Sequence, residues 1–150
     1  GVNLRASGVL FDIRVFDELY KEFGFTPVVL KGCDVWTRYK ARILEMRESV
    51  NLVKKLVDFL KKSEPLKQTL INPINLKLPK GEYQSEIEAP RGLAGCYIKS
   101  TGGSEPYRLK WRTGSYYSVN LLRELLKGNY LNDAIAIAGS LDIILPEVDK

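Results

Sequence analysis

The chain has 150 residues, 45% of them hydrophobic and 27% charged, with 23 Lys and Arg against 18 Asp and Glu, giving a formal net charge of +5. This size and balance suit one folded domain and exclude a disordered chain. With no histidine and only two distant cysteines, Cys33 and Cys96, the chain cannot build a zinc site or iron–sulfur cluster from its own thiols and imidazoles, and we expect two buried free thiols.

After an N-terminal segment over residues 1–33, apolar residues recur at intervals of three and four over residues 34–62, which predicts one long helix. Asp34 suits the N-cap, and Ser63-Glu64-Pro65 suits the end. Further leucines beside this stripe favour packing in a helix bundle. The stripe consists of Trp36, Tyr39, Ile43, Met46, Val50, Val53, Val57 and Leu60.

The segment from 63 to 81 contains prolines and has no sustained period, so we expect an irregular connection there. Residues 82–112 show a period of two, with short strands expected over 82–88, 95–100 and 107–112. The sequence Thr101-Gly102-Gly103-Ser104 suits the turn of a hairpin. A small antiparallel sheet therefore follows the long helix.

Residues 118–150 predict helices and a buried C-terminal tail. We expect an amphipathic helix over 120–127 closed by Gly128, then a very apolar, central helix over 132–138 closed by Gly139. The tail mixes large apolar residues with carboxylates, and burial of a carboxylate without a partner costs several kcal/mol. The fold class is α+β, in a single domain covering residues 1–150.

Four blocks, in order along the chain, resemble the hydrogenase-like large subunit of respiratory complex I. The closing family motif reads roughly G-S-x-D-[PI]-x-x-G-E-V-D-R. The matching blocks are residues 1–8 with Asp12-Ile13-Arg14; Arg38-Tyr39, Arg42, Glu45-Met46-Arg47 and Ser49; Glu88-Ala89-Pro90-Arg91-Gly92; and Gly139-Ser140-Leu141-Asp142-Ile143 with Glu147-Val148-Asp149-Lys150. The resemblance implies the C-terminal part of that subunit, with the fold of a nickel–iron hydrogenase large subunit.

In this family the old metal cavity forms part of the quinone-reduction chamber. The resemblance implies that Asp142, Ile143, Ile144 and Glu147 line or flank the chamber, with Asp142 and Glu147 coupling protons to quinone reduction. A structural role for Asp142, as a cap or ion pair of the last helix turn, is the alternative. We assign no other catalytic residue and no metal site to this chain.

Six basic residues are candidates for structural or interface roles: Arg5, Arg38, Arg42, Arg47, Arg91 and Lys150. Those on the long helix are expected to reach the segment around Arg5 or a neighbouring subunit, although most such charges are solvated. Arg91 or Arg47 could pair with the chain-terminal carboxylate. The block 88–92 is expected to be a structural corner without chemistry.

Nickel–iron chemistry is excluded, because Ile144, Glu147 and Lys150 occupy the positions of the metal-binding cysteines and histidine of the hydrogenases. Two further departures from the complex I pattern are Pro146, where the family has glycine, and the terminal Lys150, where it has arginine. The family's His-His-Phe-Lys segment is also missing, so a helix has been lost or is supplied by another chain.

The resemblance implies a component of a multisubunit NADH:quinone oxidoreductase that is not active alone. Its partners would be the chain with the N-terminal half of the subunit, the small subunit with a 4Fe-4S cluster, and the membrane-arm subunit of the quinone channel. Quinone would bind at a shared site, with NADH and FMN elsewhere in the complex. No apolar run reaches the roughly 18 residues of a membrane span, and Ile143 favours the matrix side of the mitochondrial inner membrane over the cytoplasmic face of a bacterial membrane.

Three alternatives remain. The chain could belong to a relative of the membrane-bound hydrogenases or of their ferredoxin-linked cousins. It could be a scaffold or assembly subunit that has kept the fold and lost the pocket. A nucleic-acid-binding module is the least favoured, because the basic residues are interleaved with acidic ones and no nucleic-acid-binding signature is present.

Overall fold

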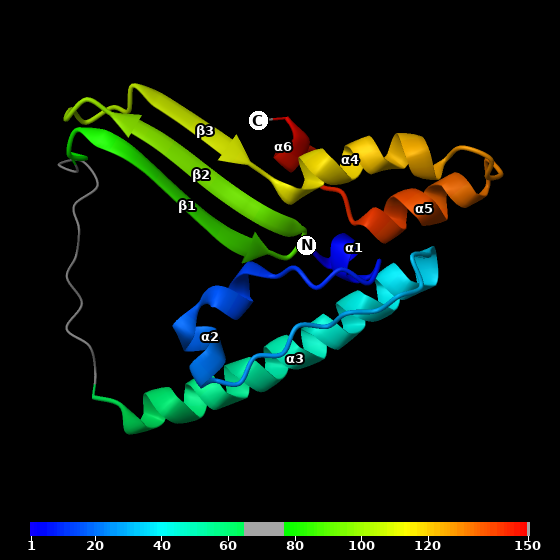
Figure 1. The fold of residues 1–150 in the computed structure, drawn as a ribbon, viewed down its shortest axis with the longest axis horizontal. Coiled ribbons are helices and arrows are strands. Elements are labelled where there is room, and N and C mark those ends of the chain that lie inside the picture. Colours follow the sequence, from blue (N-terminus) through cyan, green and yellow to red (C-terminus); the bar gives the residue numbers. More distant parts are fainter. Residues whose placement is uncertain (65–76, 150) are drawn as a thin grey trace.

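The molecule combines helices with one three-stranded antiparallel sheet, as predicted for an α+β fold (Figure 1). The structure is a computed structural model that describes residues 1–64 and 77–149. Lys150 and most of the connection predicted over 63–81 lie outside the described residues. The elements are α1 (Val2–Arg5), η1 (Ile13–Phe16), α2 (Glu18–Glu22), α3 (Val35–Lys62), β1 (Gly81–Ala89), β2 (Gly92–Ser100), β3 (Arg108–Arg112), α4 (Gly114–Leu125), α5 (Asp133–Leu141) and α6 (Leu145–Val148).

Helix α3 confirms the predicted long helix and both of its ends. The Asp34 carboxylate accepts a hydrogen bond from the backbone N–H of Thr37 at 2.7 Å, which satisfies one of the free donors of the first turn. Ser63 is the C-cap, as predicted. The helix runs along one side of the molecule, and its N-terminal half packs against α1 and α5 (Figure 1).

The orientation of α3 differs from the predicted bundle. Most of the predicted apolar stripe is exposed, with Trp36 64% exposed and Met46 55% exposed. Val53 and Leu60 border a pocket that residues of α2 also line, and Ile43 is half-buried. The first half of the inward face contains the buried polar residues Thr37 and Arg38, together with Ala41, which packs with Val2 and Ala6 in the hydrophobic core. The reason is that the arginines of this face form hydrogen bonds with the end of α5, which fixes the rotation of α3.

The sheet has the order β1-β2-β3, and both neighbouring pairs are antiparallel. β2 begins at Gly92 rather than at residue 95, because Ala89 pairs with Gly92 across a two-residue turn of Pro90 and Arg91. Gly92 has φ +127°, a conformation that side chains rarely allow. A Cβ at Gly114 would lie 2.3 Å from the Arg91 carbonyl oxygen, so the turn and the start of α4 are in direct backbone contact.

The C-terminal helices are longer than predicted. α4 begins at Gly114 rather than at residue 120, and α5 continues through Gly139 to Leu141. The residue that ends α5 in the left-handed conformation is Asp142, not Gly139. The prediction of a central α5 was wrong for one of its faces, because Ile135 is 83% exposed while Leu141 is buried.

Other sequence predictions are met only in part. The tail contacts α4 through Glu147, but Leu145 of α6 is exposed, so the tail is not fully buried. Both cysteines are free, yet Cys33 is exposed and Cys96 is half-buried, in contrast to the expected burial of both. None of the described helices is both long enough and apolar enough to cross a membrane.

Candidate functional site

Asp142 is the predicted site residue with the most unusual backbone. It is the C-cap of α5, with φ 54° and ψ 51°, a left-handed conformation that Asp and Asn tolerate better than most residues. Its half-exposed carboxylate lies 3.3 Å from Nη2 of Arg91 and 3.9 Å from Nε of Arg42. The turn between β1 and β2 and helix α3 therefore approach the same carboxylate from two sides.

Two arginines of α3 hold the end of α5. Arg38 Nε donates to Ser140 Oγ at 2.8 Å, and Arg42 Nη1 donates to the Ser140 carbonyl at 2.6 Å. The last carbonyls of a helix have no partner within it and carry partial negative charge, so guanidinium groups are favourable there. Burial lowers the pKa of both Arg38 and Arg42, and the charge of Asp142 opposes the shift at Arg42.

A cavity of about 390 Å³ opens beside Asp142. Most of its lining is charged, because Arg14, Glu45 and Glu88 join Arg42, Arg91 and Asp142, while Met46, Ala89 and Pro90 contribute apolar surface. The Nε atoms of Arg42 and Arg91 are buried and have no hydrogen-bond partner among the described residues. Ile143, Ile144 and Glu147 are not among the residues that line this cavity.

Next to this cavity, a single buried guanidinium joins three carboxylates. Arg5 is 1% exposed and forms ion pairs with Asp12 at 3.0 Å, Glu45 at 2.8 Å and Glu88 at 2.8 Å. Arg14 binds Asp12 from the other side through Nε at 2.9 Å and Nη2 at 2.7 Å. This network connects α1, η1, α3 and β1, and it encloses more carboxylates than guanidinium groups.

The charges in this network determine how Asp12 titrates. Burial alone would raise its pKa, but the hydrogen bonds from Arg14 and the charge of Arg5 outweigh burial, so the pKa of Asp12 lies below its ordinary value. The same pairing raises the pKa of Arg14, against the effect of burial. Ionised Asp12 is therefore the form that stabilises the fold.

The depressed pKa of Asp12 predicts a pH dependence of stability. Its contribution is present above the pKa of an unfolded aspartate, about 3.9, and is lost as the pH falls through the lower folded pKa. We expect the difference in unfolding free energy between the wild type and Asp12→Asn to be constant above about pH 5 and to shrink below about pH 4. Urea unfolding followed by circular dichroism measures it, and a difference that does not change with pH would contradict the assignment.

Glu147 lies apart from Asp142, at the start of α4. Its Oε2 accepts hydrogen bonds from Ser115 Oγ at 2.6 Å and from the Ser115 backbone N–H at 3.3 Å. Its own carbonyl accepts a hydrogen bond from Thr113 Oγ1. A carboxylate at a helix N-terminus is stabilised by the free N–H groups and the helix dipole, so this arrangement caps α4 from the far end of the chain.

Ser115 has a central position in this contact, because its hydroxyl also accepts a hydrogen bond from the Ile144 N–H at 3.2 Å. We expect Ser115→Ala to lower the unfolding free energy by about 1–3 kcal/mol, since the mutation leaves the Glu147 carboxylate and a backbone donor short of a partner. Ser104→Ala, at an exposed position of the β2–β3 connection, is the matched control. Equal denaturation midpoints for the two variants would argue against the cap.

The structure brings some predicted residues together and separates others. Arg42, Arg91 and Asp142 meet, whereas Arg47 is exposed and lines a different, shallow pocket. Lys150, and hence any pairing of the terminal carboxylate, lies outside the described residues. Sequence reasoning assigned no role to Ser115 or Ser140, because a serine carries no signal until its long-range partner is known. Arg91 is one of the six basic candidates named from the sequence, although the block around it was expected to carry no chemistry.

The matching protein family is described as the 49 Kd subunit of the respiratory-chain NADH dehydrogenase, and its model matches residues 1–77 and 67–150. The chain is 43% identical over 151 residues to a subunit of the NADH-quinone oxidoreductase of Geobacillus thermodenitrificans. It is also 43% identical over 152 residues to the corresponding NADH-quinone oxidoreductase subunit of Bacillus anthracis. Both alignments cover 99% of this chain but only 41% of the relative.

Among solved structures, the chain matches one from a membrane-bound sulfane sulfur reductase, an archaeal respiratory membrane complex, with a TM-score of 0.88. The identity is 38%, and the match covers 100% of this chain and 42% of the other. The family match extends over the whole chain and includes the residues that surround Asp142 and Arg5. The chain belongs to the family of the 49-kDa subunit of the respiratory-chain NADH dehydrogenase.

Proposed function

We propose that this chain is the C-terminal part of the hydrogenase-like large subunit of an NADH:quinone oxidoreductase and forms one wall of its quinone-reduction chamber. The Geobacillus and Bacillus relatives are named as subunits of NADH-quinone oxidoreductase, which supports the assignment to such a complex. The observation that supports the chamber is Asp142, which lies between Arg42 and Arg91 in the lining of a cavity. In this proposal the chain is not active alone.

The cavity beside Asp142 suits part of a quinone. Its volume of about 390 Å³ lies in the range of small-molecule sites. The buried Nε–H groups of Arg42 and Arg91 could donate to a quinone carbonyl, and the apolar wall suits a ring. Because reduction of a quinone consumes protons, the Asp142 carboxylate would take up a proton from solvent and pass it to the reduced ring.

The remaining parts of the reaction would come from other chains. NADH and FMN would bind elsewhere in the complex, and the 4Fe-4S cluster would lie in the neighbouring small subunit. The chain with the N-terminal half of the subunit would cover the outward apolar stripe of α3, and a membrane-arm subunit would supply the quinone channel. The assembly would lie on the matrix side of the mitochondrial inner membrane or on the cytoplasmic face of a bacterial membrane.

The structural match to a sulfane sulfur reductase favours a second candidate, a subunit of a respiratory complex that reduces sulfane sulfur. Both candidates place the cavity beside Asp142 in the reaction path, but they differ in the acceptor of the electrons. A scaffold subunit without a reaction of its own is the third possibility.

Native purification of the tagged chain from its source membranes would separate the three proposals. We expect a large assembly that contains a second chain with the missing part of the subunit and reduces a soluble quinone with NADH as the donor. Reduction of polysulfide without reduction of quinone would favour the sulfur candidate. Purification of a complex with neither activity would support the scaffold.

A further inference from the structure

A groove of about 810 Å³ runs between the outer edge of β1 and the α2 segment, and it adjoins the cavity beside Asp142, with which it shares Arg14 and Glu88. Figure 1 shows α2 lying between the sheet and α3, beside the end of β1. The order β1-β2-β3 leaves the outer edge of β1 without a paired strand among the described residues. Such an edge has free N–H and C=O groups that can accept another strand.

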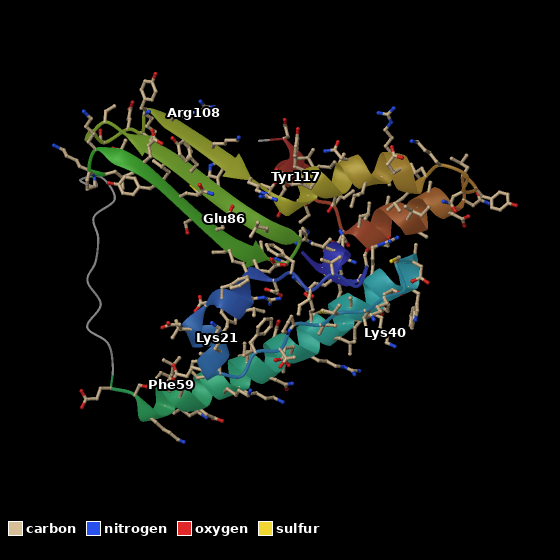
Figure 2. All side chains as sticks on the ribbon, viewed as in Figure 1. Lys21, Lys40, Phe59, Glu86, Arg108 and Tyr117 are labelled. Carbon is tan, nitrogen blue, oxygen red and sulfur yellow. The ribbon has the colours of Figure 1, made fainter. Side chains whose placement is uncertain are left out.

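Carboxylates dominate the charged groups of this groove. Asp17, Glu18 and Glu22 approach it from the α2 side, and Glu86 approaches it from β1. Figure 2 labels Glu86 on β1, at the opposite edge of the sheet from Arg108 on β3. The one cation of the lining is Arg14, which is already bound to Asp12. A local excess of negative charge in a chain of net charge +5 points to a positively charged occupant.

Glu88 supplies a second, independent indication. Its side chain is 2% exposed and lies where the groove meets the cavity beside Asp142, in the lining of both. One carboxylate oxygen pairs with Arg5 at 2.8 Å, while the other, Oε2, has no hydrogen-bond partner among the described residues. A buried carboxylate oxygen without a partner is costly, and a donor from an occupant of the groove would remove that cost.

The apolar groups of the groove define the rest of the occupant. Phe16, Leu19 and Ile87 line it and are all exposed by more than half. On β1, Glu86 and Glu88 point to one face of the sheet and Ile87 to the other, because side chains alternate along a strand. A neighbouring strand would match this pattern with basic and aliphatic residues in alternation.

We propose that an extended segment of a partner subunit, with lysine or arginine alternating with aliphatic residues, adds as a fourth strand to the outer edge of β1. Its backbone pairs with β1, its cations face Glu86 and Glu88, and its aliphatic side chains cover Ile87. The inference concerns the sheet edge and does not depend on the quinone chamber, so either proposal can fail without the other.

A second copy of this chain is a less suitable occupant. Its β3 reads Arg108-Leu109-Lys110-Trp111-Arg112 and has the required alternation. However, pairing of β3 with β1 of the next copy is a head-to-tail contact, which produces rings or open-ended chains of molecules and not a simple pair. The partner strand of the proposal therefore comes from a different subunit.

The test uses the full chain and a short synthetic peptide in which lysine and valine alternate. We expect the peptide to bind in a salt-sensitive manner and to slow hydrogen exchange at amides of β1, measured by mass spectrometry. The control peptide has the same sequence with alternate backbone amides methylated, which keeps the charge and removes strand pairing. Equal binding of both peptides, or no protection at β1, would overturn the proposal.

Charge variants test the groove itself. We expect the double variant Glu22→Lys and Glu86→Lys to weaken peptide binding by about tenfold or more, because it reverses two charges of the lining. Glu105→Lys, on the exposed β2–β3 connection, makes the same kind of change away from the groove and should bind normally. Equal weakening by Glu105→Lys would reject the groove. If the chain forms concentration-dependent oligomers and Lys110→Glu abolishes them, the occupant of the groove is a second copy of the chain and not a partner subunit.

Discussion

Replacing Arg5 by methionine is expected to lower the free energy of unfolding by about 3–5 kcal/mol, the largest stability effect that we expect of a single substitution in this chain. The guanidinium is buried and pairs with Asp12, Glu45 and Glu88. Methionine fills similar volume without charge, so three neighbouring carboxylates lose their shared cation. Arg14 can compensate only at Asp12, which it already binds.

Urea unfolding followed by circular dichroism measures the Arg5→Met effect. Arg123→Met, on the exposed surface of α4, is the matched control, and we expect it to change stability by less than about 0.5 kcal/mol. Adding Glu45→Gln and Glu88→Gln to Arg5→Met should recover part of the loss, because the repulsion between carboxylates is then removed. If Arg5→Met alone is as stable as the control, the network does not stabilise the fold.

The second large effect is expected for Asp142→Asn in the assembled complex. If Asp142 couples a proton to the reaction, quinone reduction should fall by about a hundredfold or more, while the subunit composition of the complex remains unchanged. Asparagine is the informative replacement, because it tolerates the left-handed conformation at this position and keeps the shape of the side chain. The substitution therefore removes the charge and leaves the end of α5 intact.

Asp133→Asn is the matched control for Asp142→Asn, because it makes the same change at the exposed start of α5. Electron transfer from NADH to a soluble artificial acceptor should persist in both variants, which would localise the defect to the quinone step. Unchanged quinone turnover in Asp142→Asn, or loss of the assembly itself, would favour the scaffold function over a role in quinone reduction.

Local sequence signals predicted the elements with local causes. The carboxylate of Asp34 caps a helix three residues away, and Gly102 and Gly103 lie in the connection between β2 and β3. The contacts of the site have no such local signal, because they join residues that are far apart in the sequence. Asn3 donates a hydrogen bond to the Leu141 carbonyl, and Ser115 donates one to the Glu147 carboxylate. The family resemblance supplied Asp142, and only the structure supplied its neighbours.

The errors have the same physical origin. Gly139 was expected to end α5 because glycine favours the left-handed conformation, yet the bonds from Arg38 and Arg42 to Ser140 extend the helix to Leu141. The apolar stripe of α3 was expected to face inward because hydrophobic faces usually do. Within the described residues the inward face contains Arg38 and Arg42, which bond to Ser140, and Ala41, which packs in the hydrophobic core.

The outward stripe of α3 has a consequence for the life of the protein in a cell. A row of apolar side chains along most of a 28-residue helix is the kind of surface that chaperones bind and that promotes aggregation. If another chain covers this stripe, as proposed above, copies made in excess of that partner would be removed by quality control, because chaperones and proteases act on exposed apolar surface. The cellular level of this subunit would then follow the supply of its partner rather than its own rate of synthesis.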